Sequence, residues 1–138
     1  MSQCIPPGFE PYPPASAFMA QFGPLSVRFR DDGIDLGLVV GAKHLNHQGV
    51  VHGGVVASMA DTVMAFHSAR AAGYAVATVS MNIDYLAAVR EGSWMEVRSR
   101  IDRKGSRMVF VACDGVVDET PAFRASAVFS AVRVRSVA

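Results

Sequence analysis

The 138-residue sequence contains only two cysteines, and its charges almost cancel. Cys4 and Cys113 lie far apart without the spacing of a zinc or redox motif, so we interpret them as free thiols of a reducing compartment. The 13 basic and 12 acidic residues give a formal net charge of +1, which argues against a nucleic-acid-binding protein that acts through bulk charge. No apolar run reaches the roughly 20 residues that cross a bilayer.

The first residues also lack the basic region and apolar core that mark a signal peptide, so we expect a cytoplasmic protein. Proline is scarce except in Met1–Pro24, which holds six of the seven prolines. A proline-rich segment of this kind predicts an extended arm, because each proline ring fixes φ and removes a backbone donor. Within it, Ala15–Phe22 predicts two helical turns that pack Phe18 and Phe22 onto the domain. We therefore divide the chain into an arm, residues 1–24, and one domain, residues 25–138.

From Leu25 onward, apolar residues alternate with polar ones, which predicts half-buried β-strands. Turn-forming pairs such as Asp32-Gly33 and Glu91-Gly92 separate the runs. The predicted strands are Leu25–Arg30, Ile34–Val40, Ala77–Tyr85, Trp94–Arg103, Met108–Val117 and Phe123–Val134. Because short turns join most of them, we expect the sheet to be antiparallel.

One segment interrupts this alternation. Val55–Phe66 is too long for a typical strand and is apolar but for two hydroxyl residues and Asp61. With Gly73 as its C-terminal cap, we expect a helix from about Gly53 to Ala72. Because this helix is apolar nearly all round, we expect it to be buried. The sequence therefore predicts an α+β fold in which a curved antiparallel sheet of about six strands wraps around one long central helix.

The start of this helix is a candidate binding site for a developing oxyanion. Gly53 and Gly54 lie where the first turn leaves backbone N–H groups unpaired and where the helix dipole adds positive charge. Glycine also lets a ligand approach the backbone closely. In the preceding loop, the side-chain amides of Asn46 and Gln48 could donate to a carbonyl oxygen or hold a water, although loop amides often bond only to nearby backbone.

Asp61 is the candidate catalytic carboxylate, because it is the only charged residue between His52 and His67. Helix interiors disfavour aspartate, and an unpaired buried carboxylate is costly. The alternative is that Asp61 faces solvent or has a structural role. The loop histidines, His44, His47 and His52, have no nearby cysteine or carboxylate at zinc spacing. We therefore expect no bound metal and no cofactor.

The segment Asn46–Gly54 reads NHQGVVHGG and is followed by Asp61 in the helix. This pattern, N-x-x-G-x-x-H-G-G, resembles the signature of hotdog-fold thioesterases of the phenylacetate-degradation (PaaI-like) type, in the 4-hydroxybenzoyl-CoA thioesterase superfamily. The similarity continues through Met81–Leu86 and covers roughly Leu25 to Val134. It implies a long helix wrapped by an antiparallel sheet. It also implies subunits that pair edge to edge into a homodimer or homotetramer with active sites at the dimer interface.

The resemblance also implies roles for individual residues. The Gly53 N–H, helped by Asn46, would polarise the thioester carbonyl. Asp61 of the other subunit would attack as a nucleophile or activate a water. His52 would shape the loop and contact the thioester, and Gln48 and Gly54 would also bind substrate.

A hydroxyl on the strand after the helix often assists the carboxylate in such enzymes. Thr78 occupies the matching position and is the predicted assisting residue. The alternation places Thr78 on the same face as Ser80 and Asn82, so strand parity alone does not separate the three.

The function implied by the resemblance is hydrolysis of a medium-sized aryl or aliphatic acyl-CoA to the free acid and CoA. A hotdog dehydratase or hydratase would pair its acid with an essential histidine, which the spacing here suits less well. The alternative from another class is a non-catalytic acyl-CoA-binding hotdog protein, although a binding pocket has little use for Asp61. We expect acyl-CoA and further copies of this chain as partners, and neither nucleic acid nor membrane.

Overall fold

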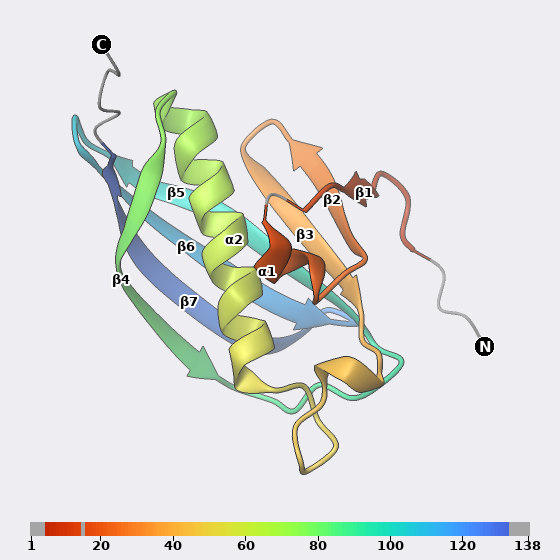
Figure 1. Cartoon of the computed structure of the whole chain (residues 1–138). Helices are drawn as coiled ribbons and strands as arrows, with labels where there is room; N and C mark the ends of the chain where they lie inside the picture. Colours follow the sequence, from red (N-terminus) through yellow and green to blue (C-terminus); the bar gives the residue numbers. More distant parts are fainter. Residues whose placement is uncertain (1–4, 15, 133–138) are drawn as a thin grey trace.

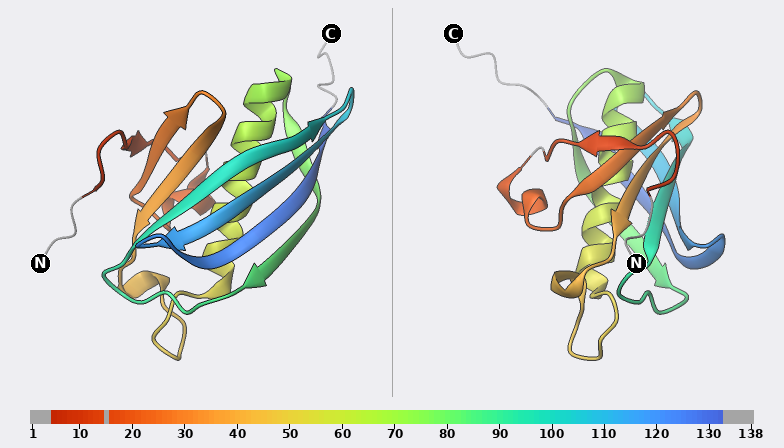
Figure 2. Two further views of the ribbon diagram at one scale, coloured as in Figure 1. Left: turned by 180° about the vertical axis from the view of Figure 1, so that it is seen from behind. Right: turned by 90° about the vertical axis from the view of Figure 1, so that its right-hand side faces the viewer.

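The computed structural model describes residues 5–14 and 16–132. Its strands are β1 (Glu10–Tyr12), β2 (Leu25–Arg30), β3 (Gly33–Val39), β4 (Val76–Tyr85), β5 (Trp94–Lys104), β6 (Met108–Val117) and β7 (Thr120–Ala131). The helices are α1 (Ala17–Ala20), the 3-10 turn η1 (Ala42–His44) and α2 (Gly53–Ala72). One antiparallel sheet, in the order β1-β2-β3-β5-β6-β7-β4, curves around α2 (Figures 1 and 2).

This architecture confirms the predicted α+β fold of one long helix and a curved antiparallel sheet, although the sheet has seven strands. The additional strand is β1, which pairs with β2 at the sheet edge. An edge strand does not need every N–H in the ladder, so it tolerates Pro11. The predicted end of the last strand, Val134, lies outside the described residues. Within the described ranges, no helix has the length and hydropathy needed to span a membrane.

The helix α2 begins at Gly53 and ends at Ala72, as predicted, and Gly73 caps it in the left-handed conformation with φ 77°. The core lies between one face of α2 and the sheet. On that face Met59, Ala60, Val63 and Met64 are almost fully buried, at the three- and four-residue spacing of one helix side.

The opposite stripe of α2 is only half-buried, because the sheet covers one side of the helix. Its members are Ala57, Asp61, Ala65 and Ala69. The prediction that α2 is buried all round is therefore wrong for a single protomer.

The N-terminal arm packs differently from the prediction. α1 forms one turn instead of two, and Ser16 Oγ caps it by accepting from the Met19 N–H at 3.2 Å. Met19 is buried, whereas Phe18 remains 58% exposed. The expected burial of Phe18 is therefore wrong, because the short helix turns Met19 toward α2. Phe22 packs against the core, as expected.

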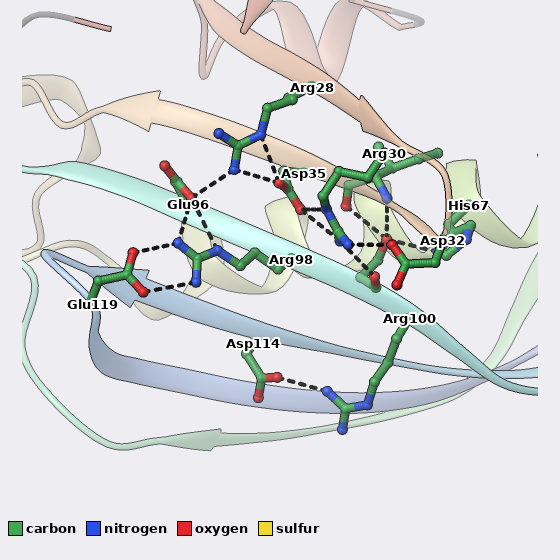
Figure 3. A network of polar contacts seen from close by, with 12 residues as sticks. Arg28, Arg30, Asp32, Asp35, His67, Glu96, Arg98, Arg100, Asp114 and Glu119 are labelled. Carbon is green, nitrogen blue, oxygen red and sulfur yellow. Dashed lines mark hydrogen bonds and ion pairs between the residues drawn. The ribbon is translucent and has the colours of Figure 1, made fainter. Parts of the chain in front are cut away.

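The face of the sheet that points away from α2 carries a row of alternating charges. The strand register aligns six residues across β2, β3, β5, β6, β7 and β4, namely Arg28, Asp35, Arg98, Asp114, Arg124 and Asp84. Ion pairs extend along and beside this row, and Figure 3 shows the part from Arg28 to Asp114. Opposite charges at facing positions favour this register over neighbouring ones.

Candidate active site

A β-bulge in β4 decides which hydroxyl faces α2. β4 pairs with β7, and the register shifts between Thr78 and Ser80, so that Val79 is an extra residue. The bulge interrupts the alternation of faces. Thr78 lies opposite the fully buried Phe129 and therefore points toward α2, whereas Ser80 and Asn82 point away. The prediction that these three residues share one face is wrong for this reason.

Asp61 and Thr78 form a hydrogen-bonded pair between α2 and β4. Thr78 Oγ1 donates to Asp61 Oδ1 at 2.6 Å, which fixes one carboxylate oxygen. The sequence predicted a fully buried carboxylate, but Asp61 is only half-buried. It borders a groove of about 670 Å³ in which it is the only charged lining residue among those described. We call Asp61 and Thr78 the carboxylate half-site.

At the start of α2, His52 occupies the N-cap position. Its Nδ1 accepts from the Gly54 N–H at 2.8 Å, and this bond satisfies one of the unpaired donors of the first turn. The structure therefore uses the Gly54 N–H internally, which argues against its predicted part in substrate binding. The Gly53 N–H has no acceptor among the described residues.

Tyr85, which the sequence did not indicate as a site residue, lies against this helix start. Its hydroxyl donates to the Gly53 carbonyl at 2.9 Å. A Cβ on residue 53 would lie 3.2 Å from that hydroxyl, so the close approach of Tyr85 favours glycine at position 53. The only advance signal was an aromatic residue at the end of a strand, which is common in any sheet.

The loop before α2 places Asn46 beside Gly53. Asn46 Oδ1 accepts from the N–H groups of Gln48 at 2.9 Å and Val50 at 3.3 Å, so the side-chain NH2 is left as a donor. Asn46, Gly53 and Tyr85 line a cavity of about 380 Å³, and we call these three residues the helix-tip half-site. Gln48 is exposed and lines neither this cavity nor the groove at Asp61.

The three loop histidines lie in different surroundings. His44 is buried; its Nδ1 accepts from the Gly41 N–H at 2.9 Å, so Nε2 carries the proton and donates to the Phe22 carbonyl at 2.6 Å. His47 is exposed, and His52 caps α2. In the part of the chain that the structure describes, no group of three or more His, Cys, Asp or Glu side chains could hold a metal ion.

Within one chain the two half-sites are too far apart to act on one carbonyl. Gly53 and Asp61 are eight residues apart on α2, which is about 12 Å along the helix axis at 1.5 Å per residue. They also border different cavities. An oxyanion donor must lie about 3 Å from the reacting oxygen, so a carbonyl held by Gly53 is out of reach of Asp61 in the same chain.

Comparison with known proteins identifies the family. The family described as the thioesterase superfamily matches residues 48–122, from the loop before α2 to the start of β7. The chain belongs to the thioesterase superfamily. The candidate esterase PA0474 of Pseudomonas aeruginosa is 32% identical to it over 111 residues, which are 78% of this chain and 83% of that protein.

Solved thioesterase structures share the fold, which is the hotdog fold. A hypothetical thioesterase with coenzyme A from Streptococcus pneumoniae superposes with a TM-score of 0.74 at 19% identity, covering 81% of this chain and 91% of that one. A mutant of the phenylacetic acid degradation protein PaaI from Thermus thermophilus gives 0.78 at 22% identity, covering 85% of this chain and 100% of that one. As a member of the thioesterase superfamily, the protein is a hydrolase.

Proposed function

We propose that the protein hydrolyses acyl-CoA thioesters at a composite site, built from the carboxylate half-site of one chain and the helix-tip half-site of a second copy. The observation that carries this proposal is the separation of Gly53 and Asp61 along α2. The similar thioesterase that contains coenzyme A and the similar PaaI structure support a CoA thioester as the substrate. A cytoplasmic location is part of the proposal and accords with the free thiol of Cys113.

In this scheme the thioester carbonyl accepts hydrogen bonds from the Gly53 N–H and the Asn46 side chain. Negative charge that develops on this oxygen is stabilised at the positive end of the α2 dipole. Asp61 of the other chain either attacks the carbonyl carbon or removes a proton from an attacking water. CoA leaves as the thiol, and water supplies the oxygen and proton that complete the free acid and the thiol.

The edge strand β4 is the proposed dimer contact. It has ten residues and ends the sheet, and most of its residues are exposed. One row of its backbone N–H and C=O groups has no strand partner among the residues that the structure describes, which is a template for pairing with another chain. A second copy that adds its own β4 antiparallel forms a two-fold dimer, and two such dimers would form the proposed tetramer.

We propose one register for this contact, in which the bulge at Val79 decides which residues face each other. Antiparallel pairing sets helix-facing residues opposite helix-facing residues. If Asn82 lies opposite its own copy on the two-fold axis, the extra residue Val79 sets Thr78 opposite Tyr85 of the partner subunit. Because Thr78 bonds Asp61 and Tyr85 bonds Gly53, this register brings the two half-sites together.

Cross-linking tests the register. In an Asn82→Cys variant the two new thiols should oxidise to a covalent dimer, because directly paired strand residues meet the Cα separation that a disulfide needs. Ser80→Cys is the control, since its two copies would lie about 13 Å apart at 3.3 Å per residue. Burial raises the pKa of Cys113 to about 12, so this native thiol should stay inert, and Cys4→Ser is included in both variants. A covalent dimer of the Ser80 variant alone would contradict the register.

Thiol release from a panel of acyl-CoAs tests the activity. We expect the wild type to release CoA and Asp61→Ala to lower kcat at least about a thousandfold, as removal of a nucleophile or general base does. Asp61→Asn should behave alike, and both variants should keep the circular dichroism spectrum and the melting temperature. Full activity of Asp61→Ala would contradict the mechanism. No release by the wild type from any substrate would favour the acyl-CoA-binding alternative.

A further inference from the structure

The groove at Asp61 continues along α2 beyond the carboxylate. Its floor is a stripe of small residues at four-residue spacing on the same helix face as Asp61, namely Ala57, Ala65 and Ala69. From Asp61 to Ala69 the helix advances about 12 Å. Because the floor side chains are single methyl groups, they leave this length open to a linear ligand.

The two walls of the groove come from distant parts of the sequence. Ala75, just before β4, and Val76, its first residue, form one wall, and Tyr12, Phe18 and Met19 of the N-terminal arm form the other. Figures 1 and 2 show α1 beside the middle of α2. The arm therefore contributes to a binding groove whose carboxylate lies in the central helix.

Specific contacts hold the arm in this position. The ring of Tyr12 packs edge-on against Phe66 of α2 with 5.9 Å between ring centres. Thr62 Oγ1 lies 3.3 Å from Met19 Sδ, its hydrogen-bond acceptor. Burial raises the pKa of Tyr12, so its hydroxyl stays neutral and adds no charge to the wall. Phe18 is anchored less firmly, since it contacts Phe22 ring to ring at 5.0 Å and stays largely exposed at the groove.

We propose that this groove holds the acyl group and selects a straight aliphatic chain of about eight carbons; this inference rests on the proposed thioesterase function. Of the roughly 12 Å from Asp61 to Ala69, about 3 Å separates the carboxylate from the carbonyl carbon, and the remaining length of about 9 Å fits about eight carbons at roughly 1.2 Å per extended bond. Beyond Asp61 the groove offers no charge among its described lining residues, which suits a hydrocarbon. A phenylacetyl group is shorter and wider, and it would leave the end near Ala69 unfilled. The arm is thus a determinant of chain-length specificity.

Filling the far end of the groove tests this proposal. We expect Ala69→Phe to lower the ratio of kcat/KM for octanoyl-CoA to that for butyryl-CoA at least about tenfold, as a lost methylene contact or two does. Phe18→Ala, which opens the arm wall, should lower the same ratio several-fold. Ala71→Phe is the matched control, because Ala71 is exposed on the same helix and does not line the groove. An unchanged ratio in Ala69→Phe, or a wild-type preference for phenylacetyl-CoA over octanoyl-CoA, would overturn the proposal.

Binding separates this inference from the proposed function. Titration calorimetry of octanoyl-CoA with Asp61→Ala reports on the groove without hydrolysis. Binding that weakens at least about tenfold in Asp61→Ala/Ala69→Phe supports the groove even if the wild type releases no thiol, a result that would overturn only the hydrolase mechanism. Equal binding by the two variants overturns the groove assignment. If Ala69→Phe lowers the melting temperature, both measurements are repeated with Ala69→Leu.

Discussion

The two ends of β4 hold α2 in the same way but present opposite chemistry. At one end the Thr78 hydroxyl donates to the Asp61 carboxylate at 2.6 Å, and at the other the Tyr85 hydroxyl donates to the Gly53 carbonyl at 2.9 Å. The first half-site ends in a negatively charged acceptor, and the second in a backbone N–H at the positive end of a helix, where no described residue accepts from it. Thioester hydrolysis needs both, and this difference supports our proposal that the active site belongs to a pair of chains.

Apart from loss of the Asp61 carboxylate, removing the donor of the helix-tip half-site should have the largest effect. Gly53→Pro deletes the N–H at the first helical position, where proline is favoured. His52 already has the extended backbone, φ −63° and ψ 134°, that a residue before proline adopts. We expect kcat to fall about 100- to 1,000-fold, as for loss of an oxyanion donor, with a melting temperature close to that of Gly53→Ala, which adds a similar Cβ beside Tyr85.

Gly53→Ala is the control for this variant, because it adds a similar Cβ beside Tyr85 but keeps the N–H. The measurement is steady-state thiol release from one acyl-CoA by both variants. If the proline variant is as active as the alanine variant, the Gly53 N–H has no part in the reaction.

On the carboxylate half-site, Thr78→Val removes the hydroxyl and keeps the side-chain shape. Loss of the bond to Asp61 should lower kcat about tenfold, since one hydrogen bond contributes about 1 kcal/mol and somewhat more when it is charged. Thr78→Ser should restore most of the rate. Ser80→Ala, on the far side of the bulge, should change nothing; equal losses in Thr78→Val and Ser80→Ala would show that the bulge does not select Thr78.

His67 provides a contrast to both half-sites, because it lies on the sheet-facing side of α2. Ser99 Oγ donates to the Ile34 carbonyl at 2.8 Å, so the His67 Nδ1, also at 2.8 Å, donates to Ser99 Oγ. Burial, and next the charge of Arg30, lower the pKa of His67 in the folded protein. The unfolded chain takes up a proton near pH 6.5, whereas the folded chain does so only at lower pH.

The stability that neutral His67 contributes should therefore be complete above about pH 6.5 and decrease as the pH falls toward the folded pKa. We expect the urea midpoint to decrease from pH 7.5 to pH 5, and His67→Asn to show a shallower decrease. The same slope in both proteins would exclude His67 as its source. The predicted change is in stability. Its effect on catalysis should be smaller than the effect of any variant described above.

The sequence predicted features that depend on neighbouring residues along the chain. The bounds of α2 followed from an apolar run and the capping Gly73, and Asp61 stood out as a lone charge in that run. The sequence alone could not distinguish Thr78 from Ser80, because the bulge at Val79 exists only through pairing with β7.

Contacts between distant segments were also missed. Tyr85 meets Gly53 across 32 residues, and no local pattern indicates that approach. The prediction that the half-buried stripe of α2 belongs to the core was wrong, because hydrophobicity does not reveal whether a sheet, an arm or a second subunit covers a helix face. The same reason applies to Phe18, whose apolar side chain borders the groove instead of the core.

Mixing two inactive variants measures the composite site most directly. Asp61→Ala lacks one half-site and Gly53→Pro lacks the other. If every active site takes one half from each chain, refolding the two together in equal amounts leaves one intact site in each mixed dimer, and about a quarter of the wild-type activity should return. If the mixture stays as inactive as the separate variants while mixed dimers form, each chain carries its own site and the account is contradicted.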